Sequence, residues 1–170
     1  MTQYDFADGL GPVAAHQHPN GGGWVADTAY VADTAYVAAN AKVYGNAKAY
    51  GDARIRGDAY VYGNAVVSGK AKVTDNAVVS GNAFVADTAY VADNAKVSDN
   101  AVVAGSAKVY GNAVVADTAY VSGSAKVYGD AKVSGNADVF GSAKVSDNAK
   151  VYGDAVVSGI AVVSGDDMIY

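Results

Sequence analysis

The chain has 170 residues, which suits one domain. Its formal net charge is −5, so the composition gives no sign of the positively charged surface that binds nucleic acid. It has no cysteine, which excludes disulfides and thiolate metal sites. Leucine occurs once, at Leu10, and all 17 acidic residues are aspartate, so the chain lacks the leucine and glutamate that a helical protein uses heavily. Val, Tyr, Gly, Asn and Asp dominate instead, and these residues favour strands and turns. The sequence predicts an all-β protein.

Residues 1–23 are predicted to form an N-terminal capping segment, because an open sheet edge invites further pairing. Pro19 and the glycine run at 21–23 suit a tight crossing over the end of the fold. His16 and His18 are the only histidines. An H-x-H pair can bind a metal ion, but without a third candidate ligand nearby it indicates a metal site only weakly. The start "MTQYDFADGL" resembles no signal peptide and no apolar run has membrane-span length, so we expect a cytoplasmic protein without a membrane partner.

A six-residue repeat begins at Val25. Stepping by six to Val163 visits 24 positions, of which 22 are Val, one is Ala49 and one is Ile55. Alanine follows four residues after each of the first 23 of these positions, from Ala29 to Ala161, so Ala and the next residue of the series lie two apart and face the same side of a strand. Gly or Asp followed by Asn, Asp, Ser or Thr supplies a corner between strands. One unit cannot bury its valine alone, so the units are expected to stack into a solenoid.

The units "GNAKVY", "GDAVVS" and "DTAYVA" resemble the hexapeptide repeat of left-handed parallel β-helices, the fold of many acyltransferases. The resemblance implies left-handed winding, three units per coil, a triangular section and about eight coils. We expect the β-helix at residues 24–165 and a C-terminal end at 166–170. The corner motif "DTAYV", which starts at Asp27, Asp33, Asp87 and Asp117, is interpreted as a turn with a local hydrogen bond. Three residues depart from the pattern: Ala49 at an inward position, and Lys70 and Ile160 at corner positions. They are interpreted as sequence variation without a functional role.

The second face of the predicted prism carries an apolar row beside a row of small residues, and a surface of this kind is unusual on a monomer. We expect a homo-oligomer. The resemblance favours a trimer with parallel axes, with a dimer as the second choice. The predicted interface consists of Val66, Phe84, Val102, Tyr120, Val156, Ala86 and Ala104.

The third face carries a cationic stripe. It is interpreted either as a solvated face whose cations neutralise the corner aspartates or as a site for a small anion or nucleotide in a groove between subunits. The residues of the stripe are Arg54, Arg56, Lys72, Lys108, Lys126 and Lys144.

The enzymes that share this fold commonly use a histidine base and often a projecting loop. This chain has no histidine after His18 and no insertion between residues 25 and 169. The absence of histidines on the coils excludes a carbonic-anhydrase zinc site, and Thr74 alone points outward from a strand, which argues against ice binding. We therefore expect a non-catalytic structural, assembly or binding protein without cofactor or metal. The alternative is an acyltransferase that uses His16 or His18. The arrays also resemble bacterial and phage proteins, so a phage-encoded protein assembled into a phage particle is a further expectation.

Overall fold

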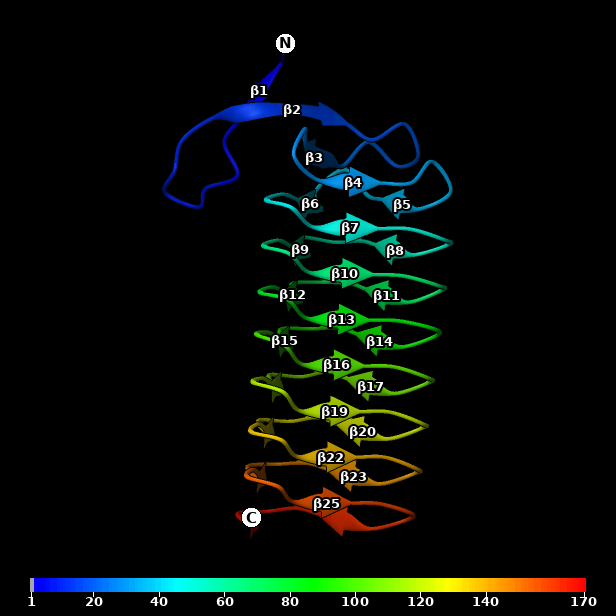
Figure 1. The fold of residues 1–170 in the computed structure, drawn as a ribbon, viewed down its shortest axis with the longest axis vertical. Coiled ribbons are helices and arrows are strands. Elements are labelled where there is room, and N and C mark those ends of the chain that lie inside the picture. The colour runs from blue at the N-terminus through cyan, green and yellow to red at the C-terminus, as the bar shows by residue number, and fades with distance from the viewer. Residues whose placement is uncertain (1) are drawn as a thin grey trace.

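The computed structural model describes residues 2–170, which contain strands and no helix. The strands stack into three parallel sheets, and these form the three sides of a solenoid of about eight coils (Figure 1). Partner strands lie 18 residues apart without slippage, as in the pairing of Val66 with Phe84. The prediction of an all-β parallel solenoid is confirmed. No helix in the described range is long and apolar enough to cross a membrane.

Each sheet takes one strand from every coil. The parallel part of the first sheet consists of β3 (Trp24–Ala26), β6 (Lys42–Val43), β9 (Tyr60–Val61), β12 (Val78–Val79), β15 (Lys96–Val97), β18 (Val114–Val115), β21 (Lys132–Val133), β24 (Lys150–Val151) and β27 (Met168–Ile169), and two antiparallel N-terminal strands extend it. The second consists of β4 (Tyr30–Val31), β7 (Lys48–Ala49), β10 (Val66–Val67), β13 (Phe84–Val85), β16 (Val102–Val103), β19 (Tyr120–Val121), β22 (Asp138–Val139) and β25 (Val156–Val157). The third consists of β5 (Tyr36–Val37), β8 (Arg54–Ile55), β11 (Lys72–Val73), β14 (Tyr90–Val91), β17 (Lys108–Val109), β20 (Lys126–Val127), β23 (Lys144–Val145) and β26 (Val162–Val163).

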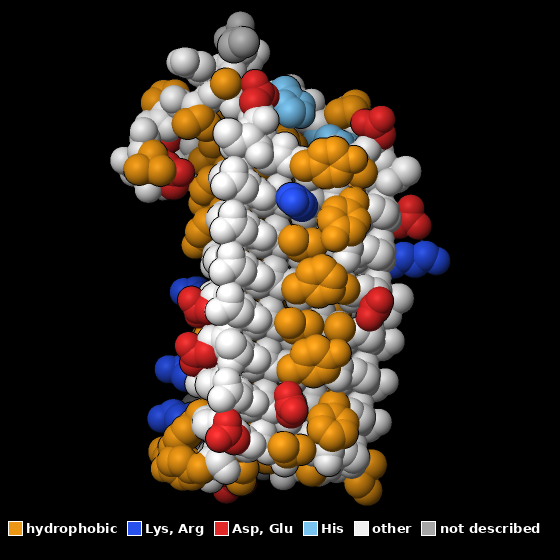
Figure 2. All heavy atoms as spheres, in the orientation of Figure 1, with side chains coloured by type: hydrophobic (Ala, Val, Ile, Leu, Met, Phe, Trp, Pro, Cys, Tyr) orange, Lys and Arg blue, Asp and Glu red, His pale blue; other side chains and the backbone are white. Residues whose placement is uncertain are grey.

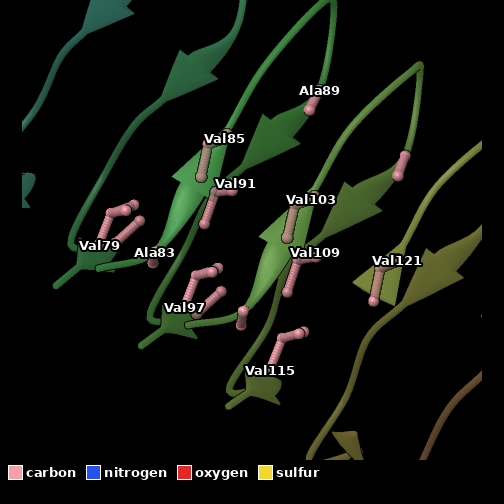
Figure 3. Close-up of a cluster of buried hydrophobic side chains, with 14 of the residues drawn as sticks. Val79, Ala83, Val85, Ala89, Val91, Val97, Val103, Val109, Val115 and Val121 are labelled. Carbon is pink, nitrogen blue, oxygen red and sulfur yellow. The ribbon is translucent and has the colours of Figure 1, made fainter. Parts of the chain in front are cut away.

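The core is a continuous column of valine and alanine inside the solenoid. Val79, Val85 and Val91 come from the three sides of one coil and point inward, and the next coil repeats the arrangement below them (Figure 3). These side chains have no solvent exposure. The narrow interior admits β-branched and small residues, which explains why valine and alanine supply the core. Ala49 and Ile55, the two departures from valine, are both buried in the same coil.

The corners bond each coil to the next. Six corner aspartates have positive φ, including Asp87 at 60°, a conformation that Asp tolerates better than most residues. The Asp87 carboxylate accepts a hydrogen bond from the N–H of Gly105 in the next coil at 2.9 Å. Thr88 donates to the Gly105 carbonyl at 3.0 Å, and the other three "DT" corners repeat this threonine bond. The expected local bond is therefore replaced by bonds between coils, because the coil below supplies backbone groups at the right height.

The N-terminal segment lies over the first coil. β1 (Gln3–Tyr4) pairs antiparallel with β2 (Val13–Gln17), and β2 pairs antiparallel with β3 at the edge of the first sheet. The segment then crosses the edge of the third sheet, where the Gly23 N–H donates to the Val37 carbonyl at 2.9 Å. A Cβ on Gly21 would lie 2.3 Å from the same carbonyl oxygen, so only glycine permits this approach. The boundaries proposed at residues 23 and 165 stay predictions; β27 continues the first sheet beyond the second of them.

Candidate functional site

A hollow of about 720 Å³ lies on the third sheet beside the N-terminal segment. Ile55 points into the core, so its neighbours Arg54 and Arg56 point outward into the hollow. Lys72 comes from β11 in the next coil, and Lys70 comes from the corner that precedes it. All four cationic side chains are exposed. The remaining lining residues are Asn20, Thr34, Tyr36, Asp52 and Thr88.

The strand register determines how the four cations are spaced. Arg54 and Lys72 are direct partners in neighbouring strands, which lie about 4.8 Å apart. Arg56 lies two residues after Arg54, just past the end of β8, and Lys70 lies two residues before Lys72, in the corner that precedes β11. Two residues of strand span roughly 7 Å. The cations therefore surround a volume that a single ligand with several anionic groups can reach.

The positive charge of the hollow is not balanced by carboxylates. Asp52 is the only acidic residue in its lining. Among residues 2–170, the one ion pair within 4.0 Å joins His16 to Asp27, so no lysine or arginine there has a carboxylate partner. The Arg56 guanidinium lies over the Tyr36 ring, 5.0 Å from its centroid, and this stacking orients one cation. The interpretation of the stripe as neutralised by corner aspartates finds no ion pair to support it.

The structure divides the predicted cationic stripe into two parts. Arg54, Arg56 and Lys72 line the hollow together. Lys108, Lys126 and Lys144 form a separate column further down the third sheet, in direct register with one another but outside the hollow. Tyr90 lies between the two groups, paired with Lys72 on one side and Lys108 on the other.

Lys70 was missed as a site residue, although the sequence carries a signal for it. The second corner position of the repeat holds Asn, Asp, Ser or Thr in every unit except two, where it holds Lys70 and Ile160. Asn and Thr side chains at this position bond to the next coil, so a long cationic side chain there indicates a different role for the side chain. The structure brings Lys70 to the same hollow as Arg54 and Lys72.

The second sheet carries the predicted apolar surface. Val66, Phe84, Val102 and Tyr120 occupy four successive strands in register, and a column of hydrophobic side chains follows this face (Figure 2). Ala86 is buried and Ala104 is partly buried beside them. Val156 is exposed but lies one strand beyond Asp138, so the structure separates it from the row. Tyr50 and Phe140, which were not predicted, are 39% and 40% exposed on the same face.

The two histidines have different surroundings. His16 is exposed on β2, and its Nδ1 lies 2.9 Å from Oδ1 of Asp27. His18 is 3% exposed, and its Nε2 has no hydrogen-bond partner. Residues 2–170 hold no group of three His, Cys, Asp or Glu side chains arranged to bind a metal ion.

A second hollow, of about 700 Å³, lies between the loop after β1 and the first sheet. Its lining is largely apolar and includes Phe6, Leu10, Tyr44 and Tyr62. Phe6 stacks on Tyr44 with ring centroids 4.9 Å apart, and Tyr44 stacks on Tyr62 at 5.0 Å. Burial raises the pKa of Tyr44 to about 12, with a smaller contribution from Tyr62.

Comparison with known proteins adds no family to this description. No protein-family model matches the chain, and no curated protein matches it.

Proposed function

We propose that this chain is a non-catalytic β-solenoid that acts as a binding and assembly protein. In this proposal it holds a small anionic ligand on its third sheet and self-associates through its second sheet. The observation that carries it is the hollow in which Arg54, Arg56, Lys70 and Lys72 converge without a carboxylate partner within 4.0 Å. The regular coils provide a rigid frame that holds these side chains in place.

The size and charge of the hollow support a compact anion with more than one charged group. Its volume of about 720 Å³ lies within the range of roughly 300–1,000 Å³ typical of ligand sites. Four cations against one aspartate leave an excess of positive charge. Arginine binds phosphate through two parallel N–H···O bonds, and lysine adds a point charge. A phosphorylated or sulfated small molecule fits these features better than a neutral one.

Calorimetric titration with inorganic pyrophosphate, with phosphate and AMP as comparison probes, tests the ligand site. We expect saturable binding of pyrophosphate that weakens roughly tenfold or more in Arg54→Ala, because a charge-assisted hydrogen bond contributes about 1.5–3 kcal/mol. Lys126→Ala is the matched control, since it removes a cation from the same sheet outside the hollow. Absence of binding by the wild-type chain, or an equal loss in the control, would overturn the proposed site.

The apolar row supports self-association through the second sheet. Val66, Phe84 and Val102 lie in register at the middle of that sheet, and no other element of the described chain pairs with it. Burial of such a row between two chains removes apolar surface from water, which favours association. Light scattering should give an oligomer for the wild type and a smaller species for Val102→Lys. A wild-type monomer at micromolar concentration contradicts self-association and leaves the anion site unaffected.

One observation favours the alternative of an acyltransferase. His16 Nδ1 lies 2.9 Å from the Asp27 carboxylate, and a carboxylate in this position can orient a histidine base. Incubation with acetyl-CoA and an assay for released thiol tests this alternative. Thiol release that is lost in His16→Ala would favour the enzyme, whereas no release by the wild type is the result expected from the proposed binding function.

A further inference from the structure

The second sheet is chemically self-complementary from end to end. One outward position on each strand, immediately before the inward-pointing residue, forms what we call the leading row. We pair the first residue of this row with the last, the second with the second-to-last, and so on toward the middle. The two residues of each inner pair are chemically complementary, either opposite in charge or both apolar. The three inner pairs are Lys48 with Asp138, Val66 with Tyr120, and Phe84 with Val102.

The neighbouring outward position, immediately after the inward-pointing residue, forms the trailing row, and it has the same property. Aromatic residues correspond at the second strand from each end, serines at the third, and alanines at the two central strands. The three inner pairs are Tyr50 with Phe140, Ser68 with Ser122, and Ala86 with Ala104, and the outermost pair is Ala32 with Ser158.

The centre of this pattern is the centre of the sheet. The sheet has eight strands, and the pattern reverses between β13 and β16, the fourth and fifth of them. Each strand pairs in register with the next, as Phe84 does with Val102, so the two rows are straight columns. A second copy with its solenoid axis reversed can therefore place each of its eight strands opposite a strand of the first copy.

We propose that two copies of this chain pack face to face through their second sheets with antiparallel solenoid axes. The inference rests on the proposed self-association and adds its symmetry. The twofold axis lies in the interface, parallel to the strands and between β13 and β16. Rotation about that axis keeps the leading row opposite the leading row while it exchanges the two ends. Lys48 then faces Asp138 of the second copy, and Phe84 faces Val102 of that copy.

Charge separates this arrangement from a face-to-face dimer with parallel axes. Parallel axes place identical coils at the same height with the leading row opposite the trailing row, so Lys48 lies opposite Tyr50 and near the other Lys48, Asp138 lies near the other Asp138, and neither charge meets its opposite. Within one chain Lys48 and Asp138 lie five strands apart, about 24 Å, too far to neutralise each other. Neither has an ion-pair partner within 4.0 Å among residues 2–170. The antiparallel dimer provides a partner for both charges, and it does so twice because of its symmetry.

The area of the sheet is sufficient for a dimer only if the whole face is used. Eight strands at about 4.8 Å span roughly 38 Å, and a side of the solenoid is about 15–20 Å wide, which gives roughly 600–750 Å² for each chain. Specific interfaces bury about 800 Å² on each partner. The four-strand apolar row alone covers about half of the length, so an arrangement centred on β13 and β16 makes the best use of the surface.

Charge reversal tests the symmetry. In the antiparallel dimer, Lys48→Asp and Asp138→Lys each replace two attractions by two repulsions, so each should raise the dissociation constant roughly tenfold to a hundredfold at low salt. The double variant Lys48→Asp/Asp138→Lys restores both attractions and should recover wild-type dimerisation. Lys96→Asp, which reverses an exposed charge on the first sheet, is the matched control. Dimers that withstand both single reversals would overturn the antiparallel arrangement and leave self-association intact.

Crosslinking gives an independent test, because the chain has no native cysteine. Chains with Tyr50→Cys and chains with Phe140→Cys should crosslink to each other through a short bismaleimide when they are mixed. Neither should crosslink to itself, because in the antiparallel dimer the two copies of either residue lie five strands apart. Parallel axes predict the reverse, with efficient crosslinking of each single variant alone. That result would refute the proposal.

Discussion

The coil that contains Ala49 and Ile55 allows a quantitative test of how the core is packed. Most coils bury three valines, whereas this coil buries Val43, Ala49 and Ile55. Its three side chains together hold one carbon fewer than three valines. We infer that the larger isoleucine occupies part of the space that the alanine leaves. Ile55→Val should therefore destabilise the chain when residue 49 is Ala and should have little effect when residue 49 is Val.

The expected magnitude follows from the buried volume. Ile55→Val removes one methylene from a side chain with no solvent exposure, which costs about 1 kcal/mol, including the cavity left behind. For a chain of this length, that free energy lowers the melting temperature by about 2–4 °C. In the Ala49→Val background the same change produces the three-valine coil found elsewhere in the solenoid. The free energy of unfolding should then change by less than about 0.5 kcal/mol.

Thermal unfolding, followed by circular dichroism, measures the four members of this double-mutant cycle. Ile160→Val, at a position 88% exposed, is a control for the chemistry of the substitution and should leave the melting temperature unchanged. A coupling free energy of about 1 kcal/mol is expected between positions 49 and 55. Additive effects, within about 0.3–0.5 kcal/mol, would show that the two side chains do not share space and would refute this account of the core.

Three further predictions concern the corners and the aromatic stack. Gly81→Ala places a Cβ 2.7 Å from the backbone nitrogen of Asp99 in the next coil and should lower the free energy of unfolding by about 1–3 kcal/mol. Gly165→Ala, whose Cβ would meet nothing within 4 Å, should lower it by less. Equal losses in chemical denaturation would contradict the steric argument. Asn82 bonds to the asparagines above and below it at 3.0 and 2.9 Å, so Asn82→Ala should lower the melting temperature by a few degrees, and an unchanged value would show that this exposed ladder contributes nothing. Burial raises the pKa of Tyr44 to about 12, so the folded state favours the neutral phenol. The stability that this preference contributes is fully present below about pH 10 and is lost as the pH rises toward 12. Tyr44→Phe should remove this late ionisation from the tyrosinate absorbance and flatten the loss of stability in that window; an unchanged titration would assign the ionisation to another tyrosine.

The candidate site shows where sequence reasoning succeeded and where it stopped. Alternation along a strand correctly places Arg54 and Arg56 on the outside, because Ile55 between them must be buried. The same rule places Lys108 outside, but alternation does not show that Lys108 lies beyond Tyr90 and away from the hollow. Lys70 was interpreted as sequence variation without a functional role because it breaks the corner pattern, although its position beside Lys72 is what brings it into the hollow. The N-terminal residue Asn20 joins the lining only because the chain folds back over the first coil.

The corners show the same limit in their hydrogen bonds. Asp and Thr indicate a turn in any single unit, and that interpretation is local. In the structure the Asp87 carboxylate accepts its bond from Gly105, 18 residues away, because one full coil returns the chain to the same corner. The sequence alone does not specify that return, which depends on three units closing one coil.

The repeat by itself determined which side chains are buried. Val and Ala lie two residues apart in each six-residue unit, so both point to the same face of a strand, and that face must be the one turned away from water. The repeat also determined the β class, the corners and the order of the outward residues on each face. The stacked structure decided which outward residues become neighbours, because contacts across coils depend on register and on the number of units in a coil. It also decided where the N-terminal segment crosses the first coil. The cationic hollow and the two-ended pattern of the second sheet therefore emerged only when the coils were placed one above another.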